Sequence, residues 1–299
     1  MLYLSAAILP VGLIILIGLI AGRSLPLQQQ TLSQLILYVL SPALIVDSLY
    51  RNNLPIASSL ALLEGFVMTS GLLYLTIRLL SQIKSFSTCS KTALVATSLF
   101  PNNGNMGLSV VSFALGTGGL ARAVIYMVGS SILMFCFGPA IIKGQGFMSG
   151  LKLIIKLPLI WAIASGLTLR IFSGDIPFQL DLGIQKVGAA AIPIALILLG
   201  MQLARTRFEL GFSELLAASI RLLIAPSIAY GVGNFLHLTG LDLQVLVLQS
   251  GMPTAVNSLV LVSEFGGDKD FTARVIVTST LLSFISIPII LWLLTYSGA

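Results

Sequence analysis

Apolar residues dominate the chain in a series of long runs, and short polar stretches between the runs carry most of the charges. A bilayer core is about 30 Å thick, so a helix needs about 20 apolar residues to cross it. Glycine, proline and charged residues mark where one run ends and the next begins. The pattern predicts ten membrane-spanning helices, at residues 5–21, 31–50, 56–80, 91–114, 120–142, 152–172, 184–204, 212–235, 241–265 and 271–296.

Composition supports a membrane protein, because 57% of the residues are hydrophobic and only 9% are charged. Ten helices with short connections use nearly all of the 299 residues, which leaves no room for a water-soluble domain. The first run lacks a basic start, and further runs follow it. We therefore expect it to be a membrane helix rather than a cleaved signal peptide.

The net charge of +6 comes from basic residues that lie singly between apolar runs and form no patch. This placement fits the positive-inside rule of membrane proteins and disfavours nucleic-acid binding. With the N-terminus outside, eleven of the 16 Lys and Arg residues fall in cytoplasmic connections and four in outside connections. We expect an integral protein of the inner or plasma membrane with both termini outside.

The fourth and ninth runs share an unusual pattern. Each carries a proline, Pro101 or Pro253, at mid-span among polar and small residues, and an asparagine follows four residues later. The second and seventh runs carry Pro42 and Pro193, and the two pairs of prolines are 152 and 151 residues apart. Five helices is an odd number, so a second copy would enter the membrane the other way up. The sequence predicts two inverted five-helix repeats, at residues 1–145 and 146–299.

The two mid-span prolines predict broken helices. Proline lacks an N–H and clashes with the carbonyl four residues back, so the backbone should open near Thr97 and near Gln249. Free backbone groups at membrane depth are tolerated only inside protein or along a water-filled cavity. Past each proline, a new half-helix begins with unpaired N–H groups and about half a unit of positive charge. An anion is the natural ligand for such a site.

Uncharged polar side chains surround both prolines and could hold a carboxylate without adding fixed charge. Glycines there would let the two crossing segments approach closely. Membrane helices are often kinked by proline alone, but two amide-rich breaks in matching positions favour a binding site. The candidate substrate-binding residues are Asn102, Asn103, Asn105, Gln249, Thr254 and Asn257, and the helix-break residues are Pro101, Gly104 and Pro253, with Gly107 beside them.

At these motifs the chain resembles the auxin efflux carrier family, which joins bacterial organic-acid transporters to the plant PIN-type auxin transporters. The matching segments extend over nearly the whole chain: Leu40–Ala43 followed by Asp47, Phe100–Leu108, Gly251–Ala255, Glu264–Asp268 and Ser283–Pro288. The resemblance implies that Pro101 and Pro253 are the crossing prolines, and that Asn102 is the amide after the first.

The resemblance also implies an architecture. Spans 1, 2, 6 and 7 would form a scaffold, spans 3–5 and 8–10 would form a moving transport domain, and the protein would often be a homodimer. The arrangement is similar to that of sodium-dependent bile acid carriers as well, which keeps sodium symport open as an alternative.

Three ionisable residues within or near spans are further candidates, because charge within a span is costly. Glu64 lies near where similar carriers place an acidic residue, and we expect either a proton-sensitive carboxylate or a hydrated one near the outer interface. Arg221 is expected either to snorkel to the cytoplasmic interface or to support the substrate site. Asp47 is expected to be interfacial rather than a coupling site.

Together these features favour a secondary transporter for small organic anions, such as auxin-like monocarboxylates or the dicarboxylates malate and malonate. Transport would follow an elevator-type alternating-access cycle, driven by the membrane potential or coupled to H⁺ or Na⁺. A channel is an alternative. An intramembrane enzyme is disfavoured, because the sequence holds no HExxH, no GxSxG and no close carboxylate pair within a span. No metal or cofactor is expected.

Overall fold

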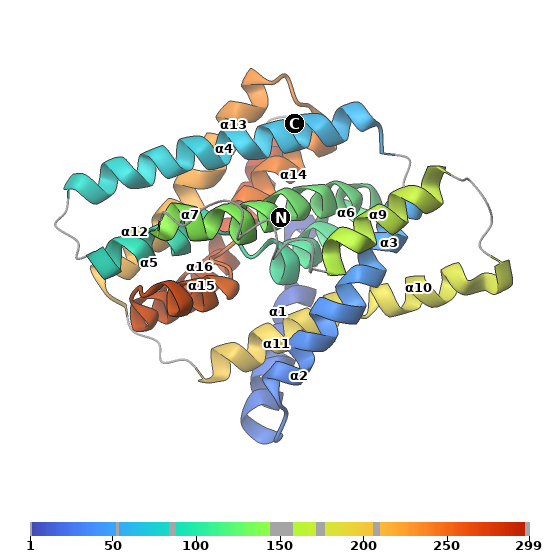
Figure 1. The fold of residues 1–299 in the computed structure, drawn as a ribbon, viewed down its shortest axis with the longest axis horizontal. Coiled ribbons are helices and arrows are strands. Elements are labelled where there is room, and N and C mark those ends of the chain that lie inside the picture. Colours follow the sequence, from blue (N-terminus) through green and yellow to red (C-terminus); the bar gives the residue numbers. More distant parts are fainter. Residues whose placement is uncertain are drawn as a thin grey trace.

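The computed structural model describes residues 2–51, 54–83, 88–143, 158–171, 177–205 and 210–296, which form helices joined by short connections, without any strand (Figure 1). The predicted boundary between residues 145 and 146 lies outside these ranges. The first helices are α1 (Leu2–Ser24), α2 (Gln29–Leu35), α3 (Ser41–Arg51), α4 (Ile56–Ile83), α5 (Thr88–Leu99), α6 (Leu108–Ile132) and α7 (Gly138–Lys143). The later ones are α9 (Pro158–Ile171), α10 (Leu180–Ala189), α11 (Ala191–Arg205), α12 (Phe212–Ser219), α13 (Ala225–Phe235), α14 (Gly240–Ser250), α15 (Asn257–Phe265) and α16 (Lys269–Tyr296).

Short π-helical segments, which have wider turns than an α-helix, join several of these helices where a proline interrupts the hydrogen-bond ladder. In three cases a proline, Pro42, Pro139 or Pro226, follows two residues after a π-helical segment. The carbonyl that each proline ring would hit lies four residues back, inside that segment. The wider turn moves this carbonyl aside, so the span continues past its proline. The π segments are η1 (Ile36–Leu40), η2 (Asn103–Gly107), η3 (Leu133–Phe137) and η5 (Ile220–Ile224), and η4 (Pro177–Gln179) is a 3₁₀ turn.

In the part of the chain that the structure describes, six helices are long and apolar enough to cross a membrane, and two shorter apolar helices accompany them. The structure therefore describes a polytopic membrane protein, and the number of ten spans stays a prediction. The expected connection between the fourth and fifth spans is reduced to a bend at Gly116, whose φ of 67° suits glycine. The six long helices are Gln29–Arg51, Ile56–Gln82, Asn103–Ile141, Pro177–Ala204, Phe212–Phe235 and Lys269–Tyr296, and the shorter ones are Ile8–Ser24 and Pro158–Ile171.

One group of helices packs around the close pair α1 and α11, in the lower and right part of Figure 1. A Cβ atom added to Gly18 would lie 2.2 Å from the carbonyl oxygen of Ile197, and one added to Gly200 would lie 2.1 Å from that of Ile15. Only glycine permits this approach, which is how small residues bring membrane helices together. In the same group, α3 packs against α9 and α10.

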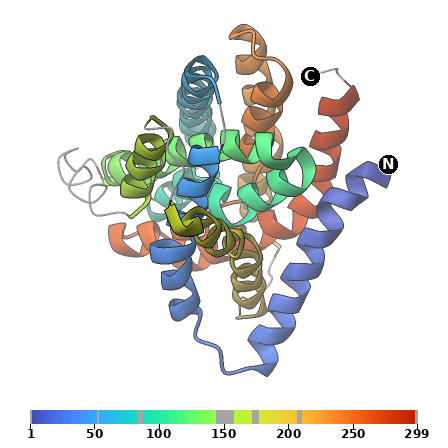
Figure 2. The same ribbon diagram turned by 90° about the vertical axis from the view of Figure 1, so that its right-hand side faces the viewer.

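A second group of helices, α4 to α7 and α12 to α16, encloses two broken segments. Within this group α4 packs against α6 and α13, α14 packs against α6 and α13, and α12 packs against α16. The groups meet where α1 contacts α6 and α16. Figure 2 shows α1 and α16, which carry the two chain ends, side by side, and Gly12 faces Phe284 there.

Candidate functional site

The chain segments around Pro101 and Pro253 cross and are joined by two backbone hydrogen bonds. The N–H of Asn102 donates to the carbonyl of Pro253 at 2.7 Å, and the N–H of Ala255 donates to the carbonyl of Phe100 at 2.9 Å. They form a single antiparallel bridge between Pro101 and Thr254. The helix α5 ends just before this bridge and α14 ends shortly before it, so two interrupted helices meet at their breaks.

Donors from the later part of the chain satisfy the carbonyls at the end of α5. These carbonyls lack intrahelical partners because the helix stops, and buried carbonyls need donors. The hydroxyl of Ser258 donates to Ala96 at 3.1 Å, the hydroxyl of Thr254 to Thr97 at 2.7 Å, and the N–H of Ala255 to Phe100. The carbonyl of Thr97, which we expected to be freed by Pro101, is thus held by a side chain from the other broken segment.

Arg221 satisfies the remaining carbonyls at this point and links both broken helices. Its Nη1 donates to the carbonyl of Ser98 at 2.9 Å and to that of Leu99 at 3.3 Å, and its Nη2 donates to the carbonyl of Ser250. The side chain is only 1% exposed, so the expectation that it snorkels to the interface is wrong. The helix C-termini are partly negative, and they replace water around the guanidinium.

A hydroxyl pair connects the crossing to α6. The Tyr126 hydroxyl lies 2.8 Å from the Ser250 hydroxyl, and the Tyr126 ring packs edge-to-face on Phe66 of α4 with centroids 4.9 Å apart. Sequence reasoning missed Tyr126 and the two serines at the helix ends. A signal existed for the serines, since Ser98 and Ser250 each precede a crossing proline by three residues.

Three candidate amides are buried at the crossing and have side-chain polar atoms without hydrogen-bond partners in the described part of the chain. They are Asn102, Asn103 and Gln249, whose exposed fractions are 4%, 2% and 0%. The amide nitrogen of Asn102 and both side-chain polar atoms of Asn103 and Gln249 lack partners. An unsatisfied buried polar group costs about 1–3 kcal/mol, so three together at a helix break indicate a place for a ligand.

Gln249 lies directly against the backbone of η2. A Cβ atom added to Gly107 would be 2.2 Å from the Gln249 Oε1 atom, so this glycine makes room for the amide. A Cβ atom added to Gly104 would meet only the Met127 sulfur, at 3.5 Å. The expectation that Gly104 permits a close approach is therefore wrong, because it faces a side chain at ordinary contact distance.

The other three substrate-binding candidates are placed differently. Thr254 is fully buried, but its hydroxyl is bonded to Thr97 and its N–H to the Ser279 hydroxyl at 3.1 Å, so it fastens the crossing. Asn105 is partly exposed in η2. Asn257 begins α15 and is exposed, outside the buried amide cluster.

Glu64 and Asp47 lie away from the crossing. Glu64 falls on the exposed stripe of α4 that also carries Leu60 and Val67. Asp47 accepts a hydrogen bond from Arg51 at 2.7 Å, and Arg51 also reaches Asp181 at 2.8 Å, so this network ties α3 to α10. In the residues that the structure covers, no group of three or more His, Cys, Asp or Glu could hold a metal ion.

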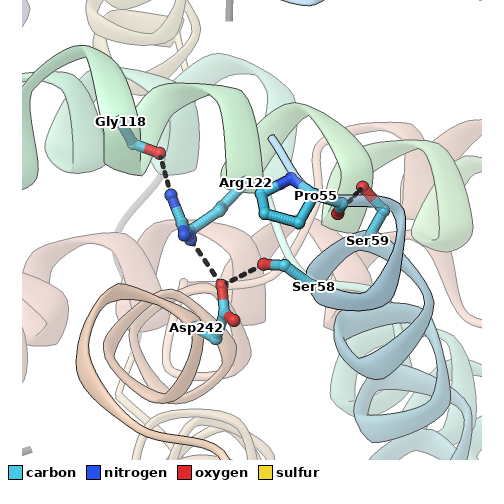
Figure 3. Close-up of polar contacts among 6 residues, drawn as sticks. All are labelled: Pro55, Ser58, Ser59, Gly118, Arg122 and Asp242. Carbon is cyan, nitrogen blue, oxygen red and sulfur yellow. Dashed lines mark hydrogen bonds and ion pairs between the residues drawn. The ribbon is translucent and has the colours of Figure 1, made fainter. Parts of the chain in front are cut away.

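Ion pairs at helix starts hold the second group together away from the crossing. Figure 3 shows Arg122 of α6 donating to Asp242 of α14 and to the carbonyl of Gly118, while Ser58 of α4 donates to the same carboxylate at 2.5 Å. Nearby, the Ser59 hydroxyl donates to the carbonyl of Pro55. A separate pair joins Arg274 of α16 to Glu214 of α12 at 2.7 Å.

Long apolar helices around two broken, crossing segments are typical of membrane proteins that transport small molecules. The family model described as "Membrane transport protein" matches residues 3–149 and 145–291 of this chain. The chain belongs to this family, the auxin efflux carrier family.

Relatives along most of the chain are also named as transporters. An "Uncharacterized transporter" of Methanothermobacter thermautotrophicus is 30% identical over 87% of this chain and 87% of its own length. The "Uncharacterized transporter YfdV" of Escherichia coli K12 is 24% identical over 86% and 87%. The "Putative malonate transporter" of Rhizobium meliloti is 24% identical over 99% and 97%. The chain is accordingly an integral membrane transporter and not an enzyme.

Proposed function

We propose that this transporter is a secondary carrier of small organic anions and binds them at the crossing of the two broken segments. The observation that carries the proposal is the cluster of unpaired amides on Asn102, Asn103 and Gln249. Amide N–H groups can donate to a carboxylate without placing a fixed charge at membrane depth. The substrate is a monocarboxylate of the auxin type or a dicarboxylate such as malate or malonate, and the relative whose name refers to malonate supports the latter.

The polarity of the helix ends at the crossing also favours an anion. Asn102 and Asn103 stand at the start of η2, and Asn257 stands at the start of α15. The first N–H groups of a helix lack intrahelical acceptors and carry about half a unit of positive charge. The carbonyl ends at the crossing already have donors, and the backbone N–H groups of Asn102 and Asn103 already donate to the carbonyls of Pro253 and Pro101. The groups left for a ligand at these positions are therefore the side-chain amides.

The carrier works by elevator-type alternating access in this proposal. The group α1, α2, α3, α9, α10 and α11 is the scaffold, and α4 to α7 with α12 to α16 is the transport domain that carries the crossing. The close packing of α1 on α11 and of α3 on α9, both within the first group, supports the division. Ten spans in two inverted repeats, a homodimer, both termini outside and an inner or plasma membrane location complete the proposal.

Export of an anion needs no further energy source when the membrane is negative inside. The potential contributes about 2.3 kcal/mol per charge for each 100 mV. A carrier also differs from a channel in a measurable way, because a carrier saturates and exchanges labelled for unlabelled substrate.

Uptake into proteoliposomes tests the proposal. Labelled malonate, malate and indole-3-acetate are offered to the wild type, to Asn102→Ala and to Gln249→Ala under imposed voltage. We expect saturable uptake with counterflow, and a fall in kcat/KM of about tenfold or more in both variants, since a hydrogen bond to a charged group contributes about 1.5–3 kcal/mol.

The control variant is Asn234→Ala, which removes an exposed amide that donates to the carbonyl of Tyr230 on α13. It should transport like the wild type. Failure of the folded wild type to carry any of the three acids would refute the anion proposal. Undiminished transport by both crossing variants would refute the site.

A further inference from the structure

The carbonyl ends of α5 and α14 meet at the guanidinium of Arg221. Each helix C-terminus carries a partial negative charge of about half a unit, so two ends bring about one unit to this point. Arg221 is only 1% exposed, so its charge is solvated by these carbonyls and not by bulk water. Its single positive charge balances the two helix ends without any ion from solvent.

The carbonyls that Arg221 contacts are of the kind that hold coupling ions in other carriers. In transporters with broken helices, unwound carbonyls and half-helix C-termini coordinate Na⁺. Here the carbonyls of Ser98, Leu99 and Ser250 accept hydrogen bonds from a side chain that is covalently part of the transporter. The neighbouring carbonyls of Thr97 and Phe100 are held by Thr254 and Ala255. A metal ion would have to displace Arg221 in order to bind.

We propose that Arg221 is a built-in counter-cation of the crossing and occupies the position that a coupling Na⁺ would otherwise take. This inference rests on the proposed function, because it assigns the ion coupling of the same site. A tethered cation stays with the crossing throughout the cycle, whereas a bound Na⁺ is carried across and released. The charge moved in each cycle is then the charge of the substrate anion alone.

Removal of the side chain should convert the vacated carbonyls into a site for a free cation. In Arg221→Ala the three oxygens border a volume that the guanidinium has left, and about one unit of negative helix charge has no counter-charge. Na⁺ or added guanidinium ion can then enter. Arg221→Lys keeps the charge on the chain and should not gain a cation site.

Transport assays in Na⁺, K⁺ or choline media test this assignment. Wild type and Arg221→Lys should show rates that differ by less than about twofold among the three media. Arg221→Ala should lose about tenfold or more of its rate in choline, because the buried helix ends lack compensation, and should recover with Na⁺ or guanidinium. A wild-type rate that requires Na⁺ would overturn the inference.

A second measurement does not depend on the substrate. The unfolding temperature of purified protein in detergent is recorded in choline, in NaCl and in guanidinium at concentrations too low to denature. Arg221→Ala should be stabilised by either cation, by about 3 °C or more, whereas the wild type should not respond. This measurement separates the two proposals, since it stands even if none of the tested anions is carried.

Arg122→Ala is the matched control, because Arg122 pairs with Asp242 in the first turn of α14, at the opposite end of this helix from Ser250. Its unfolding temperature should fall without any specific response to Na⁺ or guanidinium. The inference is also overturned if folded Arg221→Ala gains neither activity nor stability from the two cations, or if the wild type is stabilised by Na⁺. If Arg221→Ala does not fold, the cation responses of the wild type and Arg221→Lys still decide the matter.

Discussion

On one side of the crossing the carbonyls of Ala96 to Phe100 and of Ser250 all receive donors, whereas on the other side the amides of Asn102, Asn103 and Gln249 keep polar atoms unpaired. Both sets of groups are buried and lie within a few residues of the same two prolines. The local sequence and the depth of burial are therefore similar, and only the supply of partners differs.

This difference separates the fixed part of the site from the part that a ligand completes. Burying a polar group without a partner costs about 1–3 kcal/mol, and the chain avoids this cost for the carbonyls themselves with hydroxyls, a backbone N–H and a guanidinium. On the amide side it does not. We infer that the bonded carbonyls hold the crossing together throughout the transport cycle. The unpaired amides gain their hydrogen-bond partners when the substrate binds.

Asn103→Leu should have the largest effect of the variants at the crossing, because it removes two unpaired polar atoms while keeping the size of the side chain. The kcat/KM for the transported anion should fall by about tenfold or more, since donors to a charged substrate are lost. The free energy of unfolding should stay equal or rise by about 1 kcal/mol, because the buried group no longer lacks partners. Proteoliposome uptake and unfolding in detergent measure the two effects.

Opposite changes in activity and stability are the diagnostic result for Asn103→Leu. If the variant transports normally, Asn103 does not contact the anion. If it is instead destabilised by several kcal/mol, its amide has a structural partner and the amide side of the crossing is not free.

The breaks themselves could be predicted from the sequence, because Pro101 and Pro253 stand at mid-span among polar and small residues, whereas proline alone leaves α1 and α16 continuous at Pro10 and Pro288. Two of the three buried amides, on Asn102 and Asn103, directly follow Pro101. The sequence predicts a connection at residues 115–119, whereas the structure has only a bend at Gly116, since a single glycine at positive φ can turn a helix without adding residues.

The burial and the neighbours of a side chain depend on which face of its helix packs inward. The sequence of a helix that is apolar on all faces does not show which face this is. The sequence therefore could not show that Glu64 lies on the exposed stripe of α4. Gly104 and Gly107 are three residues apart, yet only Gly107 lies against Gln249. The hydrogen-bond partners of Arg221 could not be predicted from the sequence either. Every residue has a carbonyl, and only the fold shows which carbonyls lack a donor within their own helix.

Gly107→Ala should have a smaller effect on transport than Asn103→Leu. The added methyl group would collide with the Gln249 Oε1 atom, and the amide must move or the helices must separate. We expect kcat/KM to fall by about fivefold, since overpacking costs about 1–3 kcal/mol. Gly104→Ala is the control, because its Cβ has room beside Met127, and it should transport within twofold of the wild type, consistent with the mild cost of ordinary contact. Equal losses in the two variants would mean that the position of Gln249 does not govern binding.

Thr254→Val should give the smallest effect and acts on the carbonyl side. Valine keeps the shape of threonine but cannot donate to the carbonyl of Thr97, where the hydroxyl now donates at 2.7 Å. The free energy of unfolding should fall by about 1 kcal/mol, and the KM for the anion should stay within about twofold of the wild type, because this hydroxyl is already committed to the fold. Thr76→Val provides the comparison, since its hydroxyl donates to the carbonyl of Leu72 within one exposed turn of α4 and its loss should change neither quantity. A large rise in KM with unchanged stability would place Thr254 among the groups that hold the substrate, and the division between the two sides of the crossing would then be wrong at this residue.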